Sequence, residues 1–245
     1  MEDSNNISGA GDSFKKVTPV KPPVIVVVHP VEPPAPVKIN IQTYQDLKAL
    51  VKSKGFLFFE KDDYNLNFVW QRTSDIITNY FTDFLHVAYG INGVEQLLTI
   101  PATTKAGIKG AIDSPITYDG VTGTAIIIPD QYIGAWEFHD SYTEFSTYPY
   151  FRQIKPIKYW RDGNKDLVID EVQEQDGKIF GTHWHRMSNI GYTGYPINNW
   201  SLGCMGAEEP NWKKLLPATR ESVKRFAIPS VPHTAFTGTI IETYK

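Results

Sequence analysis

The spacing of hydrophobic residues predicts one clear helix over residues 43–55. Its apolar positions recur three or four residues apart, at Tyr44, Leu47, Leu50 and Val51. Thr43 is placed to cap the start of the helix, with Asp46 three residues later to complete a capping box. Gly55 is typical of a helix C-terminus.

After this helix the apolar residues occur in short runs separated by Gly, Pro and Asp, which is typical of strands. We expect strands at Phe56–Phe59, Asn65–Gln71, Thr124–Ile128, Ala135–Phe138, Ile154–Trp160, Val168–Val172 and Ile179–His185. A second long helix is predicted over residues 209–226, interrupted by Pro217. The pattern therefore predicts a mainly β domain with a few helices over residues 41–245.

Residues 1–40 have a different composition. Seven of the 17 prolines lie between Pro19 and Pro36, after a Gly/Ser/Asn-rich tip. Proline removes a backbone donor and fixes φ, so this stretch is expected to form an extended arm. The apolar run Val24–Val28 leaves two interpretations. The arm is a semi-rigid tether, or residues 14–40 lie on a neighbouring subunit by edge pairing.

Charge and apolar run length exclude several classes of protein. There are 24 Lys+Arg and 27 Asp+Glu, so the net charge is 24 − 27 = −3. This balance argues against a sequence-independent nucleic-acid binder, which needs a basic surface. Val24–Val28 has five residues, whereas a membrane span needs about 20. The acidic start Met1-Glu-Asp differs from a signal peptide, so we expect synthesis in the cytosol without an export signal.

The segment richest in chemistry combines two histidines with the single cysteine. Residues two apart on a strand share a face, so His183 and His185 are expected to point the same way. Cys204 follows in the turn Ser201-Leu-Gly-Cys204, where backbone N–H groups can lower the pKa of the thiol. An imidazole could take the thiol proton, and the Gly203 and Cys204 amides could stabilise an oxyanion. The sequence thus predicts a Cys–His acyl-transfer site, the alternative being a buried thiol that packs as a small hydrophobe.

His185 followed within twenty residues by Ser201-x-Gly203-Cys204 resembles the signature of L,D-transpeptidase catalytic domains, which have a β-sandwich fold. The chain is more similar still to an uncharacterised phage and prophage group. That group carries a Tyr-Arg-Asp-x-Asn-x-Asp turn, an Asn-Ile-His-Arg-Ala segment and a Trp-Ser-Ala-Gly-Cys segment. The corresponding segments here are residues 159–166, 183–186 and 200–204, and residues 123–132 resemble the group's central strand. The resemblance covers about residues 42–226.

The resemblance implies a role for each matching residue. Cys204 would be the nucleophile and His185 the general base, Ser201 the first position of the nucleophile motif and Gly203 the glycine of its tight turn. Leu202 stands where the transpeptidases have histidine, and Met205-Gly206 where they have Ile-Arg. Since that arginine helps to hold a substrate carboxylate, the departures imply a different substrate, a hydrolase, or a site without activity.

The expected function is a virion-associated cysteine enzyme that hydrolyses or transfers amide bonds in the peptide stems of peptidoglycan, without a cofactor for catalysis. The expected substrate contacts are His183, Trp184, Arg186 and Trp200. The two tryptophans could equally be core residues. Residues 14–40 would contact other virion proteins. The alternative is a structural tail or capsid-associated protein that retains the fold without catalysis.

The spacing of potential ligands is compatible with two metal sites. Asp162, Asn164, Asp166 and Asp170 occupy positions 1, 3, 5 and 9 of a loop, with the Val168 carbonyl at position 7, as in calcium loops. Position 6 is not glycine and position 12 is not glutamate, so a hairpin whose side chains cap their own backbone is the alternative. A zinc site could combine His183 and His185 with Cys204 or His139.

Overall fold

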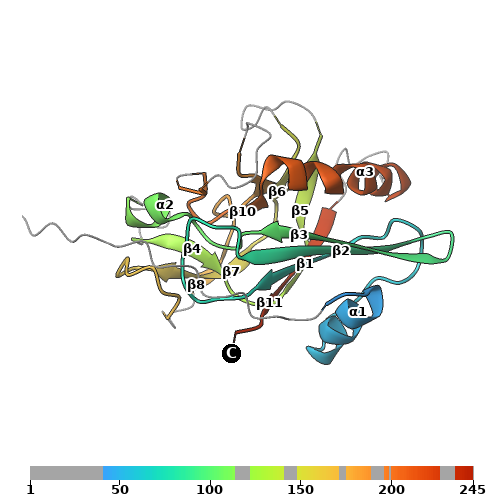
Figure 1. Ribbon diagram of the computed structural model, residues 1–245, viewed down its shortest axis with the longest axis horizontal. Helices are drawn as coiled ribbons and strands as arrows, with labels where there is room; N and C mark the ends of the chain where they lie inside the picture. Colours follow the sequence, from blue (N-terminus) through green and yellow to red (C-terminus); the bar gives the residue numbers. More distant parts are fainter. Residues whose placement is uncertain are drawn as a thin grey trace, which may run out of the picture. The chain divides into compact units, whose positions relative to one another are not determined.

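The computed structural model describes residues 41–113, 122–140, 148–170, 175–188, 196–198, 200–226 and 235–244. The predicted arm, including residues 14–40, lies outside them. The helices are α1 (Tyr44–Ser53), α2 (Ile108–Ile112) and α3 (Glu209–Phe226) (Figure 1). The strands are β1 (Asn67–Arg72), β2 (Asp83–Ile91), β3 (Val94–Ala102), β4 (Thr124–Ile127), β5 (Gln131–His139), β6 (Tyr150–Gln153), β7 (Ile157–Asp162), β8 (Gln175–Lys178), β9 (Trp184–Arg186), β10 (Met205–Ala207) and β11 (Ala235–Glu242).

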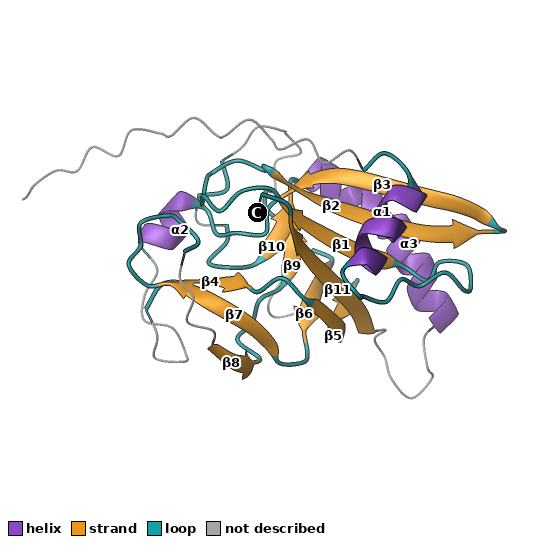
Figure 2. Ribbon diagram, turned by 90° about the horizontal axis from the view of Figure 1, so that it is seen from below, coloured by secondary structure: helices purple, strands orange, loops and turns teal. Residues whose placement is uncertain are grey.

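Eight of the described strands form one sheet in the order β10-β9-β6-β5-β11-β1-β2-β3 (Figure 2). An isolated bridge between Thr103, just after β3, and Gly206 in β10 links the two edges of this sheet. The sheet is therefore nearly closed on itself. A separate three-stranded sheet has the order β4-β7-β8. The prediction of a mainly β domain with few helices is confirmed.

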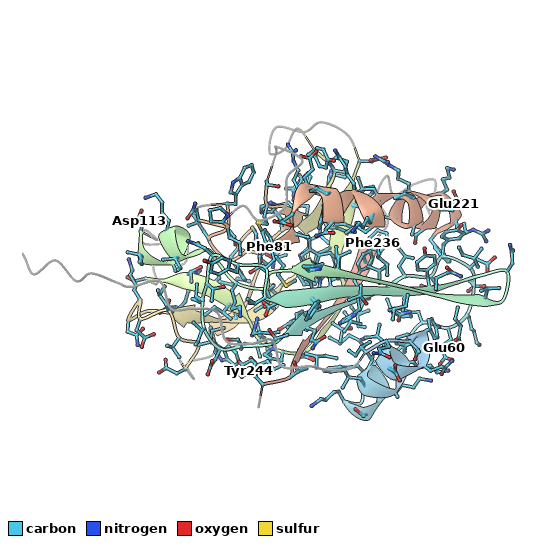
Figure 3. All side chains as sticks on the ribbon, viewed as in Figure 1. Glu60, Phe81, Asp113, Glu221, Phe236 and Tyr244 are labelled. Carbon is cyan, nitrogen blue, oxygen red and sulfur yellow. The ribbon has the colours of Figure 1, made fainter. Side chains whose placement is uncertain are left out.

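The curled sheet encloses a core rich in aromatic rings. Trp136 and Trp184 lie 4.4 Å apart between ring centroids and are fully buried. Phe236 (labelled in Figure 3) packs at 5.3 Å from Phe151 in the same core. A Cβ at Gly238 would lie 2.5 Å from Trp184 Cζ2 and 2.7 Å from Trp136 Cζ3. Gly238 thus leaves the space that these two indoles fill.

The two longer helices lie on opposite sides of the β1–β2–β3 part of the sheet (Figure 1). In α1, the predicted capping box is present: Asp46 N–H donates to Thr43 Oγ1 at 3.1 Å, and Thr43 N–H donates to Asp46 Oδ2 at 2.9 Å. Helix α1 packs Leu47 and Val51 against Val69 of β1. Helix α3 instead contributes apolar side chains to the aromatic core, namely Trp212, Leu215, Leu216 and Ala218. None of the helices in the described residues is long and apolar enough to cross a membrane.

Several predicted elements have other boundaries. Residues 56–59 are not a strand; the Phe59 N–H and carbonyl instead bond to the Asn67 side chain at 2.7 and 2.8 Å. Strand β7 begins three residues later than predicted. Of the strand predicted at Val168–Val172, Val168 forms an isolated bridge with Ile76, and residues 171–172 lie outside the described residues. Helix α3 continues through Pro217, because burial of its apolar face outweighs the cost of about 3 kcal/mol for an interior proline.

Candidate functional site

The two histidines and the cysteine lie on one face of neighbouring strands. Strand β9 runs parallel to β10, with Met205 beside Trp184 and Gly206 beside His185. Trp184 and Met205 are fully buried in the core. Side chains alternate along strands, so His183, His185 and Cys204 face away from that core. The prediction that the two histidines share a face agrees with this arrangement.

Strands β5 and β6 add polar groups to this face. Phe151 pairs with Trp184 in register, and Tyr150 and Arg152, its neighbours along β6, lie on the face opposite the core. The His183 ring meets the Tyr150 ring edge-on at 5.5 Å, and Tyr150 stacks on His139 at 5.2 Å. Neither Tyr150 nor Arg152 is part of the motifs that predict the site. The signal available was the alternation of polar 150 and 152 with apolar 151.

Glu137 completes this polar face from β5. It lies in register with Arg152, and its Oε1 is 2.7 Å from His139 Nε2. The sequence pattern assigns His139 only to a possible zinc site and assigns no role to Glu137. These residues lie about 65 positions before Cys204, and strand pairing rather than local spacing brings them to the same face.

Hydroxyl groups hold the turn that carries Cys204. Ser201 Oγ accepts a hydrogen bond from the Gly203 N–H at 3.0 Å and donates one to the Cys204 carbonyl at 2.8 Å. Thr182 Oγ1 donates to the Gly203 carbonyl at 2.9 Å. Ser201 thus occupies the Gly203 N–H in this arrangement, so this amide is not free to bind an oxyanion, and its predicted role stays a prediction. Of the Gly203 and Cys204 amides, the Cys204 N–H remains to stabilise an oxyanion.

Position 203 requires glycine for two reasons. Its φ is +134°, a backbone conformation that other residues rarely adopt. A Cβ there would lie 2.7 Å from the Ala125 carbonyl oxygen in β4. Thr124, also in β4, donates from Oγ1 to the Leu202 carbonyl at 2.6 Å. The role of Gly203 in a tight turn is thus supported by geometry, and β4 positions that turn.

The Cys204 thiol is half-buried and bonds to backbone groups. Its Sγ accepts from the His183 N–H at 3.4 Å and donates to the Gly181 carbonyl at 3.8 Å. Burial raises the pKa of Cys204 to about 11, while the His183 N–H acts in the opposite direction. The expected lowering of the thiol pKa is therefore wrong, because loss of solvation outweighs one weak backbone donor. No hydrogen bond among the described residues joins Sγ to an imidazole.

His185 is held in one tautomer by its own strand. Its Nδ1 lies 2.6 Å from the Arg186 carbonyl oxygen, which can only accept, so Nδ1 carries the proton. Burial lowers the pKa of His185. The imidazole is thus neutral near pH 7, with the lone pair of Nε2 free to accept a proton.

His183 is held in the opposite tautomer. The Gln153 backbone N–H donates to His183 Nδ1 at 3.3 Å, so in the neutral ring the proton lies on Nε2. Burial lowers the pKa of His183 to about 4, and the positive charge of Arg152 adds to this effect. The site therefore contains one imidazole arranged as an acceptor and one arranged as a donor.

Gln153 also fixes the loop that precedes His183. The buried side chain accepts three backbone N–H groups at its Oε1, from Phe180, Gly181 and Thr182, at 3.1 to 3.2 Å. Its Nε2 donates to the carbonyls of Lys155 and Lys178. Because Gln153 satisfies these amides, residues 179–183 do not join the predicted strand, and β9 is limited to Trp184–Arg186.

The remaining predicted substrate contacts divide into buried and exposed residues. Trp184 is fully buried, so it belongs to the core, which is the alternative that the sequence left open. The Arg186 guanidinium lies 3.4 Å from Glu209 and 4.0 Å from the Tyr148 ring centroid, so it ties β9 to α3. Trp200 keeps 39% of its surface exposed and is available to a ligand.

The residues predicted to bind calcium or zinc do not form a cluster of ligands in the described part of the chain. Among the residues that the structure describes, no three His, Cys, Asp or Glu side chains gather closely enough to hold a metal ion. In the loop predicted to bind calcium, Asp162 is buried in β7 whereas Asn164, Asp166 and Asp170 are exposed. Asn164 Oδ1 accepts from the Asp166 N–H at 3.1 Å, and Asp166 Oδ1 from the Val168 N–H at 2.9 Å. These bonds are the backbone capping that the alternative interpretation expected, and calcium binding stays a prediction.

No family model matches the chain, and no match was found among curated proteins or solved structures. The resemblance to L,D-transpeptidases therefore rests on the sequence motifs.

Proposed function

We propose that this protein is a cysteine enzyme of the L,D-transpeptidase type, its nearly closed sheet being a variant of that β-sandwich fold, and that it acts on amide bonds in the peptide stems of peptidoglycan. One observation carries the proposal. His185 donates from Nδ1 to the Arg186 carbonyl, which leaves Nε2 as a base on the same face as Cys204, one strand away.

The reaction would proceed in two steps. His185 Nε2 takes the Cys204 proton as Sγ attacks the amide carbonyl carbon, and the carbonyl π electrons move to oxygen. The C–N bond then breaks, the nitrogen receives the proton from His185, and a thioester remains on Cys204. Water gives hydrolysis, or a second amine gives transpeptidation, by the same steps in reverse.

The raised pKa of Cys204 decides when the proton moves. At neutral pH the thiol keeps its proton in the free protein. Transfer to His185 must accompany attack on the substrate, because the thiolate has no stable solvation before the carbonyl is present. Such a resting thiol is protected from nonspecific oxidation and alkylation, which react with the thiolate.

The motif resemblance to phage and prophage sequences supports a place in a virion, where the protein would act on the wall of the host cell. The second candidate is a structural virion protein without catalysis. The same raised thiol pKa favours it, as does the bonding of Sγ to backbone groups rather than to an imidazole.

Purified peptidoglycan distinguishes the two candidates. Wild-type protein and C204A would each be incubated with the peptidoglycan, and the released and cross-linked muropeptides identified by mass spectrometry. We expect new products with the wild type and none with C204A. S53A, which changes an exposed serine at the end of α1, is the control and should match the wild type. Identical profiles for wild type and C204A would favour the structural role.

A further inference from the structure

Attack by Cys204 on a carbonyl creates an oxyanion that needs hydrogen-bond donors. The Gly203 N–H is already bonded to Ser201 Oγ at 3.0 Å, leaving the Cys204 N–H from this turn. One amide is a weak oxyanion site, because removing a single donor from such a site typically costs about 10²- to 10³-fold in rate. A second donor must therefore come from a neighbouring element.

The candidate for this donor is His183, whose backbone lies beside Cys204. The His183 carbonyl accepts from the Met205 N–H at 3.0 Å, and the His183 N–H reaches Cys204 Sγ at 3.4 Å. These two bonds place His183 directly beside Cys204 on the adjacent strand. Neighbouring strands lie about 4.8 Å apart, so two side chains on the same face at adjacent positions can both contact one substrate carbonyl.

The tautomer of His183 gives it a donor. The Gln153 N–H occupies Nδ1 at 3.3 Å, so the neutral ring must carry its proton on Nε2. We propose that this Nε2–H of His183 donates a hydrogen bond to the oxyanion formed at Cys204, alongside the Cys204 N–H. The inference rests on the proposed cysteine chemistry and assigns the second catalytic role at that site.

A neutral imidazole suits this role. An imidazolium at position 183 would place a second proton against the Gln153 N–H, and burial opposes the charge as well, lowering the pKa of His183 to about 4. The donor therefore stays neutral across the working pH range, as a fixed dipole rather than a titrating charge. During the reaction it keeps its proton: the thiol proton goes to His185 and then to the leaving group.

Two reagents separate this role from the thiol's own reactivity. Acylation by p-nitrophenyl acetate passes through an oxyanion, whereas alkylation by iodoacetamide does not. Both rates would be measured on wild type, H183F and H183N, each on full-length protein. We expect H183F to lower the acylation rate about 10²- to 10³-fold relative to the wild type. Its alkylation rate should stay within about threefold of the wild-type rate. H183N retains an N–H donor, so its acylation rate should be at least tenfold higher than that of H183F.

The outcomes distinguish the two proposals. Equal acylation of wild type and H183F overturns the role of His183 and leaves the thiol chemistry intact. If the ester fails to acylate wild-type Cys204, the catalytic thiol is overturned, and the role of His183 with it. Parallel loss of both rates would indicate a structural role for His183 and also contradict the inference. If circular dichroism shows that H183F does not fold with the phenylalanine ring beside Tyr150, H183A replaces it. The same ratio of acylation rate to alkylation rate is then compared with that of the wild type.

Discussion

The Gln153 backbone N–H donates a hydrogen bond to His183 Nδ1 at 3.3 Å, and this single contact decides which nitrogen of His183 carries a proton. The side chain of the same glutamine anchors the loop that leads to the histidine. One residue of β6 therefore controls both the position and the tautomer of a residue in the candidate site.

Replacing the Gln153 side chain should destabilise the protein. Q153A leaves three backbone N–H groups of residues 180–182 without their acceptor, and we expect the free energy of unfolding to fall by about 2–4 kcal/mol. Urea unfolding followed by fluorescence measures this. Q45A removes an exposed glutamine of α1 and should change stability by less than about 0.5 kcal/mol. Similar effects for the two variants would contradict the anchoring role.

Acid should destabilise the protein before its carboxylates titrate. Burial lowers the pKa of both His86 and His183 to about 4, below the unfolded value of about 6.5. The unfolded chain therefore binds more protons in this range, and stability present above pH 6.5 is lost as the pH falls toward 4. Between pH 6.5 and 5 we expect the free energy of unfolding to fall by about 1.5 kcal/mol per histidine, and by less in total in H183N. A free energy of unfolding that is constant over this interval would exclude buried neutral histidines.

The rate at which Cys204 is alkylated should show no plateau near neutral pH. Because burial raises the pKa of Cys204 to about 11, the rate of alkylation by iodoacetamide should rise about tenfold per pH unit from pH 7 to 10. The urea-unfolded protein is the control and should level off above its pKa of about 8.5. A plateau between pH 6 and 8 in the folded protein would indicate a preformed thiolate–imidazolium pair and contradict the assignment.

Filling the space at Gly238 should be costly. In G238A the new Cβ would lie 2.5 Å from Trp184 and 2.7 Å from Trp136, and neither buried indole can withdraw easily. We expect a loss of about 1–3 kcal/mol in the free energy of unfolding. G90A is the matched control, because a Cβ at Gly90 of β2 meets no atom within 4 Å. A neutral G238A would show that the aromatic core is loosely packed.

The loop of residues 162–170 should be stable without metal. We expect EDTA to leave the melting temperature unchanged, because Asn164 and Asp166 cap the loop backbone themselves. D166A should lower the free energy of unfolding by about 0.5–1.5 kcal/mol by removing the bond to the Val168 N–H. A melting temperature that rises with millimolar Ca²⁺ in the wild type and not in D166A would instead establish the calcium site.

Features that depend on neighbours along the chain were predictable. The capping box of α1 and the mainly β character follow from residue spacing. The tight turn at Gly203 follows from the local motif that contains this glycine. The shared face of His183 and His185 follows from the two-residue period of a strand. Each involves groups within a few residues of one another, so local sequence contains the needed information.

Tertiary structure decided how the chemical groups behave. Sequence favoured a lowered thiol pKa and a free Gly203 amide, but burial raised that pKa and Ser201 occupied the amide. The tautomer of His183 depends on Gln153, thirty residues earlier in the chain. The sequence by itself thus determined which reactive side chains are present and which face they share. Protonation and accessibility depend on desolvation and on hydrogen-bond partners brought together from distant strands, and these exist only once the sheet has closed around its core.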